Sequence, residues 1–211
     1  MADEAETGWS RRDFVGAASL LALAVGVPGA AAFLSGLDAN EAPSDRQVSL
    51  MREVAQLVIP RSETPGAGDA GAGAFVILAL AHGLDGTRKP AASAEMPFAF
   101  PNYQRPDGSL RFVDWLENTL DRAAGGDWLG KPGEERQSIL AALDAEAFAE
   151  GADAHPWRKI KGLILTGYYT SEPGGALELR YEPDAGRFEP KLPQSPETRA
   201  MSNDWTAVEF G

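Results

Sequence analysis

The chain contains no cysteine and only two histidines, His82 and His155. Without thiols it forms no disulfide, attaches no haem through thioethers and supplies no thiolate to an iron–sulfur cluster. Two histidines leave little for zinc, copper or haem ligation. We therefore expect no metal ligand in this chain, and we interpret each histidine as a helix cap or a surface group.

Positive charge is also scarce, with 19 Lys and Arg against 31 Asp and Glu and a formal net charge of −12. Such a chain repels phosphate, so we expect no nucleic-acid partner. The sequence has no G-x-S-x-G elbow and no H-E-x-x-H motif. The glycines of residues 68–73 lack the Lys-Ser/Thr of a phosphate loop and predict a loop or close helix packing. Acidic pairs such as Asp144 and Glu146 predict solvated helix faces. We therefore predict no catalytic residue and no cofactor-binding residue.

An export signal is the most informative feature that is present. A pair of arginines stands before a run from residue 14 to 37 that has no charged side chain, and small residues follow at 30–32. The pattern S-R-R-x-F resembles the twin-arginine type, which exports folded proteins. Its residues are Ser10, Arg11, Arg12 and Phe14.

The same run is long enough to span a bilayer, so an uncleaved anchor is the alternative. Its many alanines and glycines and the interruption at Pro28 make it weakly hydrophobic for that role. We predict a twin-arginine signal peptide at residues 1–32, a linker at 33–43 and a periplasmic location.

Hydrophobic spacing predicts an all-α domain of about five helices, joined by long irregular loops and followed by an extended tail at residues 189–211. The predicted helices run from Ser44 to Pro60, across Phe75–His82, from near Ser109 to Gly125, after Pro132 to Phe148, and from Pro156 to Tyr168. Ser44 and Gln47 predict a capping box. The apolar stripe of the last helix predicts that Tyr168 is buried and Tyr169 is not.

Two segments carry a family resemblance. The first reads I-P-R-S-E-T-P-G-A at residues 59–67, and the second reads G-Y-Y-T-S-E at residues 167–172. Together with the leader they resemble the gluconate 2-dehydrogenase subunit 3 family, over about residues 44–188. One departure is Ala185 before Gly186, where the family leads us to expect proline.

The resemblance implies a small subunit without a redox cofactor of its own. Its partner would be a flavoprotein large subunit of the glucose–methanol–choline oxidoreductases, which holds FAD and determines the sugar or polyol substrate. Some such complexes add a multihaem cytochrome c. The large subunit commonly lacks an export signal and travels with the small one, so contact with the membrane would come only through the complex or an uncleaved signal.

The two family segments are also the expected partner interface, because tyrosines combine a large contact area with a polar tip. The expected interface residues are Pro60, Arg61, Thr64, Pro65, Tyr169, Thr170, Ser171 and Glu172.

Two other interpretations stay open at the level of the sequence. In the first, the chain acts alone as a periplasmic sugar-binding protein or enzyme whose tryptophans stack on a sugar; these are Trp115, Trp128, Trp157 and Trp205. It would alternatively be an export chaperone that leaves its cargo after transport.

Overall fold

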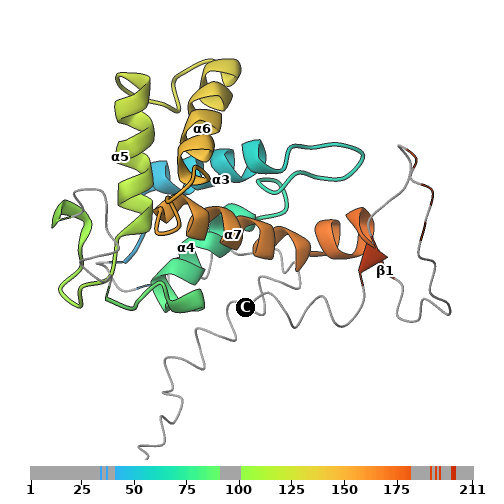
Figure 1. Cartoon of the computed structure of the whole chain (residues 1–211), viewed down its shortest axis with the longest axis horizontal. Coiled ribbons are helices and arrows are strands. Elements are labelled where there is room, and N and C mark those ends of the chain that lie inside the picture. The colour runs from blue at the N-terminus through green and yellow to red at the C-terminus, as the bar shows by residue number, and fades with distance from the viewer. Residues whose placement is uncertain are drawn as a thin grey trace, which may run out of the picture.

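The computed structural model describes residues 41–90 and 101–181 and, outside these ranges, Leu34, Leu37, Lys191, Pro193, Ser195 and Met201–Ser202. Within this part of the chain there are five α-helices, which confirms the predicted all-α class (Figure 1). They are α3 (Asp45–Val58), α4 (Ala72–His82), α5 (Phe112–Ala124), α6 (Gly133–Ala147) and α7 (Pro156–Tyr169). The leader with Ser10, Arg11, Arg12 and Phe14 lies outside the described residues, as do most of the linker and of the tail.

The beginning of α3 follows from its local sequence. The Ser44 hydroxyl accepts a hydrogen bond from the Gln47 amide at 3.1 Å, and the Gln47 side chain accepts one from the Ser44 amide at 3.0 Å. This reciprocal pair is the predicted capping box. The helix ends before Pro60, because the residue that precedes a proline is driven out of the helical conformation.

The beginning of α7 uses an unusual cap. His155 is buried, and its Nδ1 accepts a hydrogen bond from the Trp157 amide at 3.2 Å. Pro156 occupies the first turn, where its missing amide hydrogen costs nothing. The predicted capping role of His155 is therefore confirmed, while His82 is the exposed last residue of α4.

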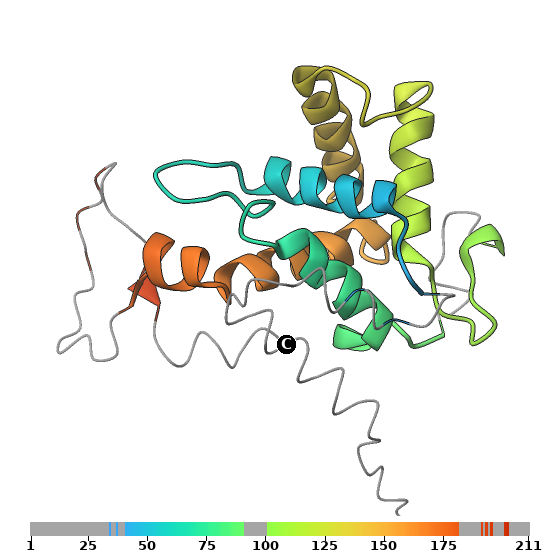
Figure 2. The ribbon, with the colours of Figure 1, turned by 180° about the vertical axis from the view of Figure 1, so that it is seen from behind.

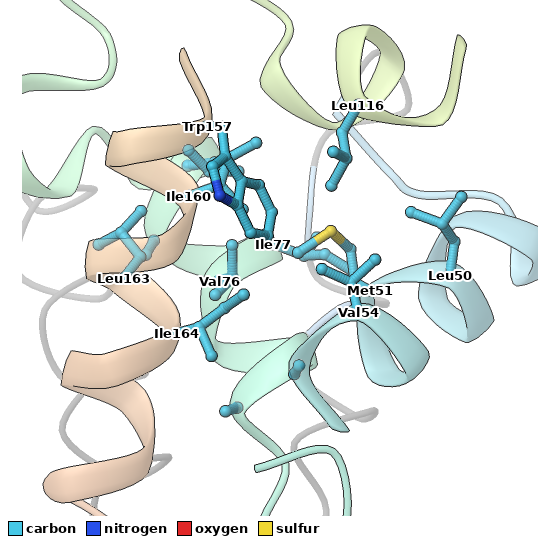
Figure 3. Close-up of a cluster of buried hydrophobic side chains, with 14 of the residues drawn as sticks. Leu50, Met51, Val54, Val76, Ile77, Leu116, Trp157, Ile160, Leu163 and Ile164 are labelled. Carbon is cyan, nitrogen blue, oxygen red and sulfur yellow. The ribbon is translucent and has the colours of Figure 1, made fainter. Parts of the chain in front are cut away.

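The hydrophobic core lies between α3, α4 and α7, and α5 closes one end of it (Figure 3). Helices α5 and α6 lie side by side and stand across the other three (Figures 1 and 2). The core side chains that Figure 3 labels are Leu50, Met51, Val54, Val76, Ile77, Leu116, Trp157, Ile160, Leu163 and Ile164. Helix α4 is buried over most of its length, which accounts for its apolar sequence on all sides.

Two glycines let α3 and the chain that enters α4 approach closely. A Cβ atom on Gly73 would lie 2.7 Å from the Arg52 amide nitrogen and 2.8 Å from the Met51 carbonyl carbon. A Cβ atom on Gly68 would collide with the Arg52 carbonyl oxygen. The glycine-rich stretch thus serves close helix packing, as its sequence predicts.

Asp144 corrects the expectation of a solvated acidic face on α6. Its carboxylate accepts hydrogen bonds from Trp157 Nε1 at 2.7 Å and from Lys161 Nζ at 2.7 Å. These bonds and the Lys161 charge hold the pKa of Asp144 below its ordinary value, although partial burial acts in the opposite direction. Asp144 therefore fastens α6 to α7, whereas Glu146 is exposed as predicted.

The third predicted helix begins later than expected, at Phe112 instead of near Ser109. Asp107 accepts hydrogen bonds from both the amide and the hydroxyl of Ser109, at 2.9 and 2.6 Å, and so stabilises a turn there. A single bridge between Gln104 and Leu110 closes this turn.

The end of α7 also differs from the predicted loop. After Thr170 the chain forms a π-helical segment, η3 (Pro173–Glu178), and then a two-residue strand, β1 (Arg180–Tyr181). This strand pairs in parallel with β2 (Met201–Ser202). No helix in the described ranges combines the length and apolar character needed to cross a membrane.

Candidate partner interface

The two segments that carry the family resemblance meet in space at Tyr168. The Tyr168 hydroxyl donates a hydrogen bond to the Pro65 carbonyl oxygen at 3.1 Å and lies 3.4 Å from the Thr64 hydroxyl. Thr64 in turn donates to the Glu178 carboxylate of η3. Figures 1 and 2 both show the α3–α4 loop and the end of α7 on the same side of the molecule. Residues about a hundred positions apart therefore form one structural unit.

The loop half of this unit is closed by its own backbone. The Ala67 amide donates to the Ile59 carbonyl at 2.9 Å, and the Ser62 amide donates to the Thr64 carbonyl at 3.1 Å. Gly66 has no room for a side chain, since a Cβ atom there would lie 2.7 Å from the Ile59 carbonyl oxygen. The loop is therefore fixed in shape, and it holds Pro60 and Arg61 at the surface.

A buried serine organises the other half. The Ser171 hydroxyl donates to the Tyr168 carbonyl at 2.6 Å and lies 3.4 Å from the Gly174 amide, which donates to it. A Cβ atom on Gly174 would collide with the Tyr168 carbonyl oxygen, so only glycine lets η3 fold back against α7 here. Thr170 adds a bond from its hydroxyl to the Thr166 carbonyl at 2.7 Å.

The paired tyrosines face opposite ways, as the sequence predicts. Tyr168 is 1% exposed and Tyr169 is 37% exposed, and their rings meet edge to face with centroids 5.2 Å apart. Partial burial raises the pKa of Tyr169, and the nearby Glu178 carboxylate adds to that rise. The Tyr169 hydroxyl consequently stays protonated at neutral pH and is able to donate a hydrogen bond outward.

Two arginines share one carboxylate at the rim of this unit. Asp69 accepts from Arg61 at 2.7 Å and from Arg52 at 3.0 Å, and these contacts, above all the bond from Arg61, lower the pKa of Asp69. The arginine side chains remain 63% and 69% exposed. We call this group of Arg52, Arg61 and Asp69 the arginine clamp.

The expected interface residues therefore divide into two groups. The exposed ones are Pro60, Arg61, Tyr169, Thr170 and Glu172, and Pro65 is half-buried. Thr64 and Ser171 are buried, at 8% and 3% exposure, and their hydroxyls are used inside the subunit. Their side chains support the surface from within, so their expected contact with a partner is at most indirect.

Sequence reasoning missed Glu178, Asp69 and the exposed Leu165 and Leu177. Glu178 and Asp69 have no local signal, because their partners are fixed by tertiary contacts. The exposure of Leu165 did have a local signal in the sequence. Leu165 lies three residues after Gly162 and four before Tyr169, on the side of α7 opposite the predicted core face.

A sugar site built from tryptophans is not supported by the burial of these rings. Trp115, Trp128 and Trp157 are 6%, 0% and 1% exposed and belong to the core, while Trp205 lies outside the described residues. In the described ranges no group of three or more histidine or acidic side chains is placed to hold a metal ion. A hollow of about 500 Å³ lies beside the start of α7, lined among others by Asp85, His155 and Lys159.

Comparison with known proteins gives a family over most of the chain. Residues 45–186 match the family described as gluconate 2-dehydrogenase subunit 3. A curated relative, 2-succinyl-5-enolpyruvyl-6-hydroxy-3-cyclohexene-1-carboxylate synthase of Pectobacterium carotovorum subsp. carotovorum (strain PC1), is 34% identical over 98 residues, which are 46% of this chain. The chain covers only 14% of that synthase's length, so the likeness concerns a fragment of it. No solved structure matches. The match over residues 45–186, which contains both meeting segments, shows that this chain belongs to the gluconate 2-dehydrogenase subunit 3 family.

Proposed function

We propose that this chain is the non-catalytic small subunit of a periplasmic, FAD-dependent sugar or polyol dehydrogenase. In this role it binds the flavoprotein large subunit, stabilises it and carries the twin-arginine export signal for both. The observation that carries the proposal is the family match, over a range in which residues 59–67 and 167–178 join at Tyr168. The fixed surface they form has the features of a binding site for another protein.

The stabilising role follows from mass action. A partner that binds only the folded flavoprotein raises its free energy of unfolding by RT ln(1 + [L]/Kd), about 4 kcal/mol when its concentration is a thousand times Kd. The small subunit needs no redox group for this purpose. FAD would belong to the large subunit, and where a multihaem cytochrome c is present it would accept the electrons.

The interface would be centred on the exposed members of the joined unit. Tyr169 offers an aromatic ring with a polar tip, while Arg61 and Glu172 offer exposed charges of opposite sign on the two joined segments. Thr64 and Ser171 would keep these groups in place through the contacts to Glu178 and to the Tyr168 carbonyl. Because the shape exists before binding, little conformational entropy would be lost on assembly.

The proposal is tested by producing the full chain with and without a glucose–methanol–choline flavoprotein of the same organism. We expect the two to co-purify with bound FAD and sugar-dependent dye reduction, and the flavoprotein alone to be less soluble or to melt at a lower temperature. The chain alone should carry no flavin absorbance. A chain that binds flavin or oxidises a sugar by itself, or that never retains the flavoprotein, would contradict the proposal.

A further inference from the structure

The outward side of α7 is unexpectedly apolar. Among the described residues, the large hydrophobic side chains that are exposed all lie on or against this helix or its continuation in η3. They are Phe148 at 50%, Leu165 at 38%, Tyr169 at 37% and Leu177 at 49% exposure. A helix on the surface of a single subunit normally turns charged and polar residues toward water. This face therefore resembles the core of an interface.

Helical spacing makes the face continuous. Gly162, Leu165 and Tyr169 recur at intervals of three and four residues, so they form one stripe along α7. The buried residues Ile160 and Ile164 lie on the opposite side, against α4. The same side of α7 also carries Arg158 and Thr166, so the apolar stripe lies among polar side chains, and packing within the described chain leaves Leu165 and Tyr169 exposed.

Phe148 extends the stripe beyond the start of α7. Its ring is covered by the Arg158 guanidinium, 4.7 Å from the ring centroid, and by the Lys161 ammonium at 4.8 Å. These cation–π contacts fix the ring although half of its surface is open. A ring held in one orientation before binding loses little freedom when a partner covers it.

No contact within the described chain explains why residue 162 is a glycine. A Cβ atom there would meet no atom within 4 Å, and the residue does not have a positive φ. Gly167, five residues on, differs sharply: a Cβ atom there would lie 2.6 Å from the Phe75 ring. Glycine in the middle of a helix is destabilising relative to alanine. An exposed glycine in an apolar stripe fits a place where another molecule approaches the helix backbone.

We propose that the outward face of α7, formed by Phe148, Gly162, Leu165, Tyr169 and Leu177, is the core of the docking surface for the flavoprotein large subunit, with Gly162 receiving a large apolar side chain of that partner. The arginine clamp, next to the loop that Tyr168 holds, takes a partner carboxylate. This inference rests on the proposed function and adds the location and chemistry of the contact.

Area and charge both favour a protein of this kind as the occupant. An interface between proteins buries about 800 Å² on each side, with an apolar core and a polar rim. Four half-exposed large side chains supply such a core, and the clamp and Glu172 supply a rim. A second copy of this chain would bring together two molecules that each carry a net charge of −12, which repel one another.

The test uses the full chain and the tagged flavoprotein that tests the proposed function. Gly162→Ala should raise the unfolding temperature of the isolated chain, because alanine favours the helix, and yet weaken capture by the flavoprotein. Gly162→Leu should weaken capture about tenfold or more, the size of effect typical of a residue at the centre of an interface. A merely structural role for Gly162 would not separate stability from binding in this way.

Matched controls lie on α6. Gly133→Ala is a glycine replacement at an exposed helical position where a Cβ atom meets nothing nearer than the Arg136 side chain at 3.9 Å. Ser138→Leu places a leucine at another exposed helical position. Both should bind like wild type. At the rim, Arg61→Glu should weaken capture at low salt, and the loss should shrink as salt screens the pair.

The possible outcomes separate the two proposals. If wild type never captures the flavoprotein, the proposed function fails. If wild type captures it and both Gly162 variants bind equally well while melting as expected, the proposed function stands and this docking surface is wrong. If the variants instead abolish self-association of the chain and leave capture intact, a second copy is the occupant and the inference is overturned.

Discussion

At the scale of single residues, the two adjacent tyrosines show how one helix assigns identical side chains to different roles. Successive residues of α7 are turned by about 100° around its axis, so Tyr168 enters the core and Tyr169 leaves it. Tyr168 also reaches the Pro65 carbonyl and the Thr64 hydroxyl, and thus holds the 59–67 loop. Tyr169 touches Tyr168 at the ring edge and otherwise has an open side.

This division predicts opposite effects of alanine at the two positions. Tyr168→Ala should lower the free energy of unfolding by about 3–5 kcal/mol, as removal of a buried aromatic ring does. Tyr169→Ala should cost about 1 kcal/mol or less in stability but weaken assembly with the flavoprotein by about 1–2 kcal/mol. Urea unfolding and pull-down of both variants measure the two effects. If Tyr169→Ala melts low and assembles normally, the roles of the two faces are reversed.

A second residue-scale prediction concerns His155. Burial lowers the pKa of His155 below its ordinary value of 6.5, and the Arg158 charge lowers it further, against an opposing influence of Glu146. The unfolded chain therefore binds more protons than the folded chain once the pH falls below about 6.5. The stability contributed by the neutral cap is complete above that pH and is lost as the pH falls through the folded-state pKa.

Accordingly, His155→Asn should keep a cap acceptor while it flattens the loss of stability between about pH 7.5 and 5.5. Denaturant unfolding at several pH values gives the slope directly. The carboxylates with lowered pKa values, such as Asp69 and Asp144, titrate at more acidic pH and do not confuse the comparison.

At the scale of elements, the glycine positions distinguish internal packing from external contact. Gly73→Ala should lower the free energy of unfolding by about 1–3 kcal/mol, because the new Cβ atom would press on the backbone of Met51 and Arg52. The control Gly133→Ala should be neutral or stabilising, since its new methyl group meets no crowded neighbour. Thermal melts of the two variants measure this difference in stability, and equal melting temperatures would contradict close α3–α4 packing.

The starts of helices were predicted best where a single apolar stripe of the helix packs against the core. Helices α3, α6 and α7 begin within a residue of their predicted starts, because Ser44, Pro132 and His155 mark these starts in the local sequence. Helix α4 starts three residues before the predicted Phe75, because its glycines hide the periodicity. The π-helical η3 was missed since Pro173 and Gly174 read as a loop.

The candidate site was predictable only in its local part. Periodicity correctly separated the faces of Tyr168 and Tyr169, and the two family segments lie together in the structure, while their role as a partner interface stays a prediction. Their meeting was not predictable, because the contact from Tyr168 to Pro65 joins residues that are 103 positions apart. The buried positions of Thr64 and Ser171 depend on that meeting and could not be inferred from spacing.

At the scale of the whole molecule, the proposed export signal and the proposed docking surface belong to one chain, and this makes transport of the partner depend on assembly. The twin-arginine route carries folded cargo, so a flavoprotein that has bound FAD in the cytoplasm would leave with this subunit attached. A partner without its own signal leaves the cytoplasm only if its complex with this subunit stays intact during transport.

We therefore expect the double change Arg11→Lys with Arg12→Lys to retain both this chain and its flavoprotein in the cytoplasm. Lysine keeps the positive charge but lacks the planar, five-donor guanidinium, so recognition of the pair should fail while folding of residues 45–186 is unaffected. Cell fractionation followed by measurement of FAD and sugar-dependent dye reduction in each compartment gives the answer. Arg122→Lys, at an exposed position of α5, is the matched control and should export normally. Combining wild-type arginines with Gly162→Leu should lower the share of the flavoprotein that reaches the periplasm while this chain is still exported, and an unchanged share would contradict the coupling of export to docking at this surface.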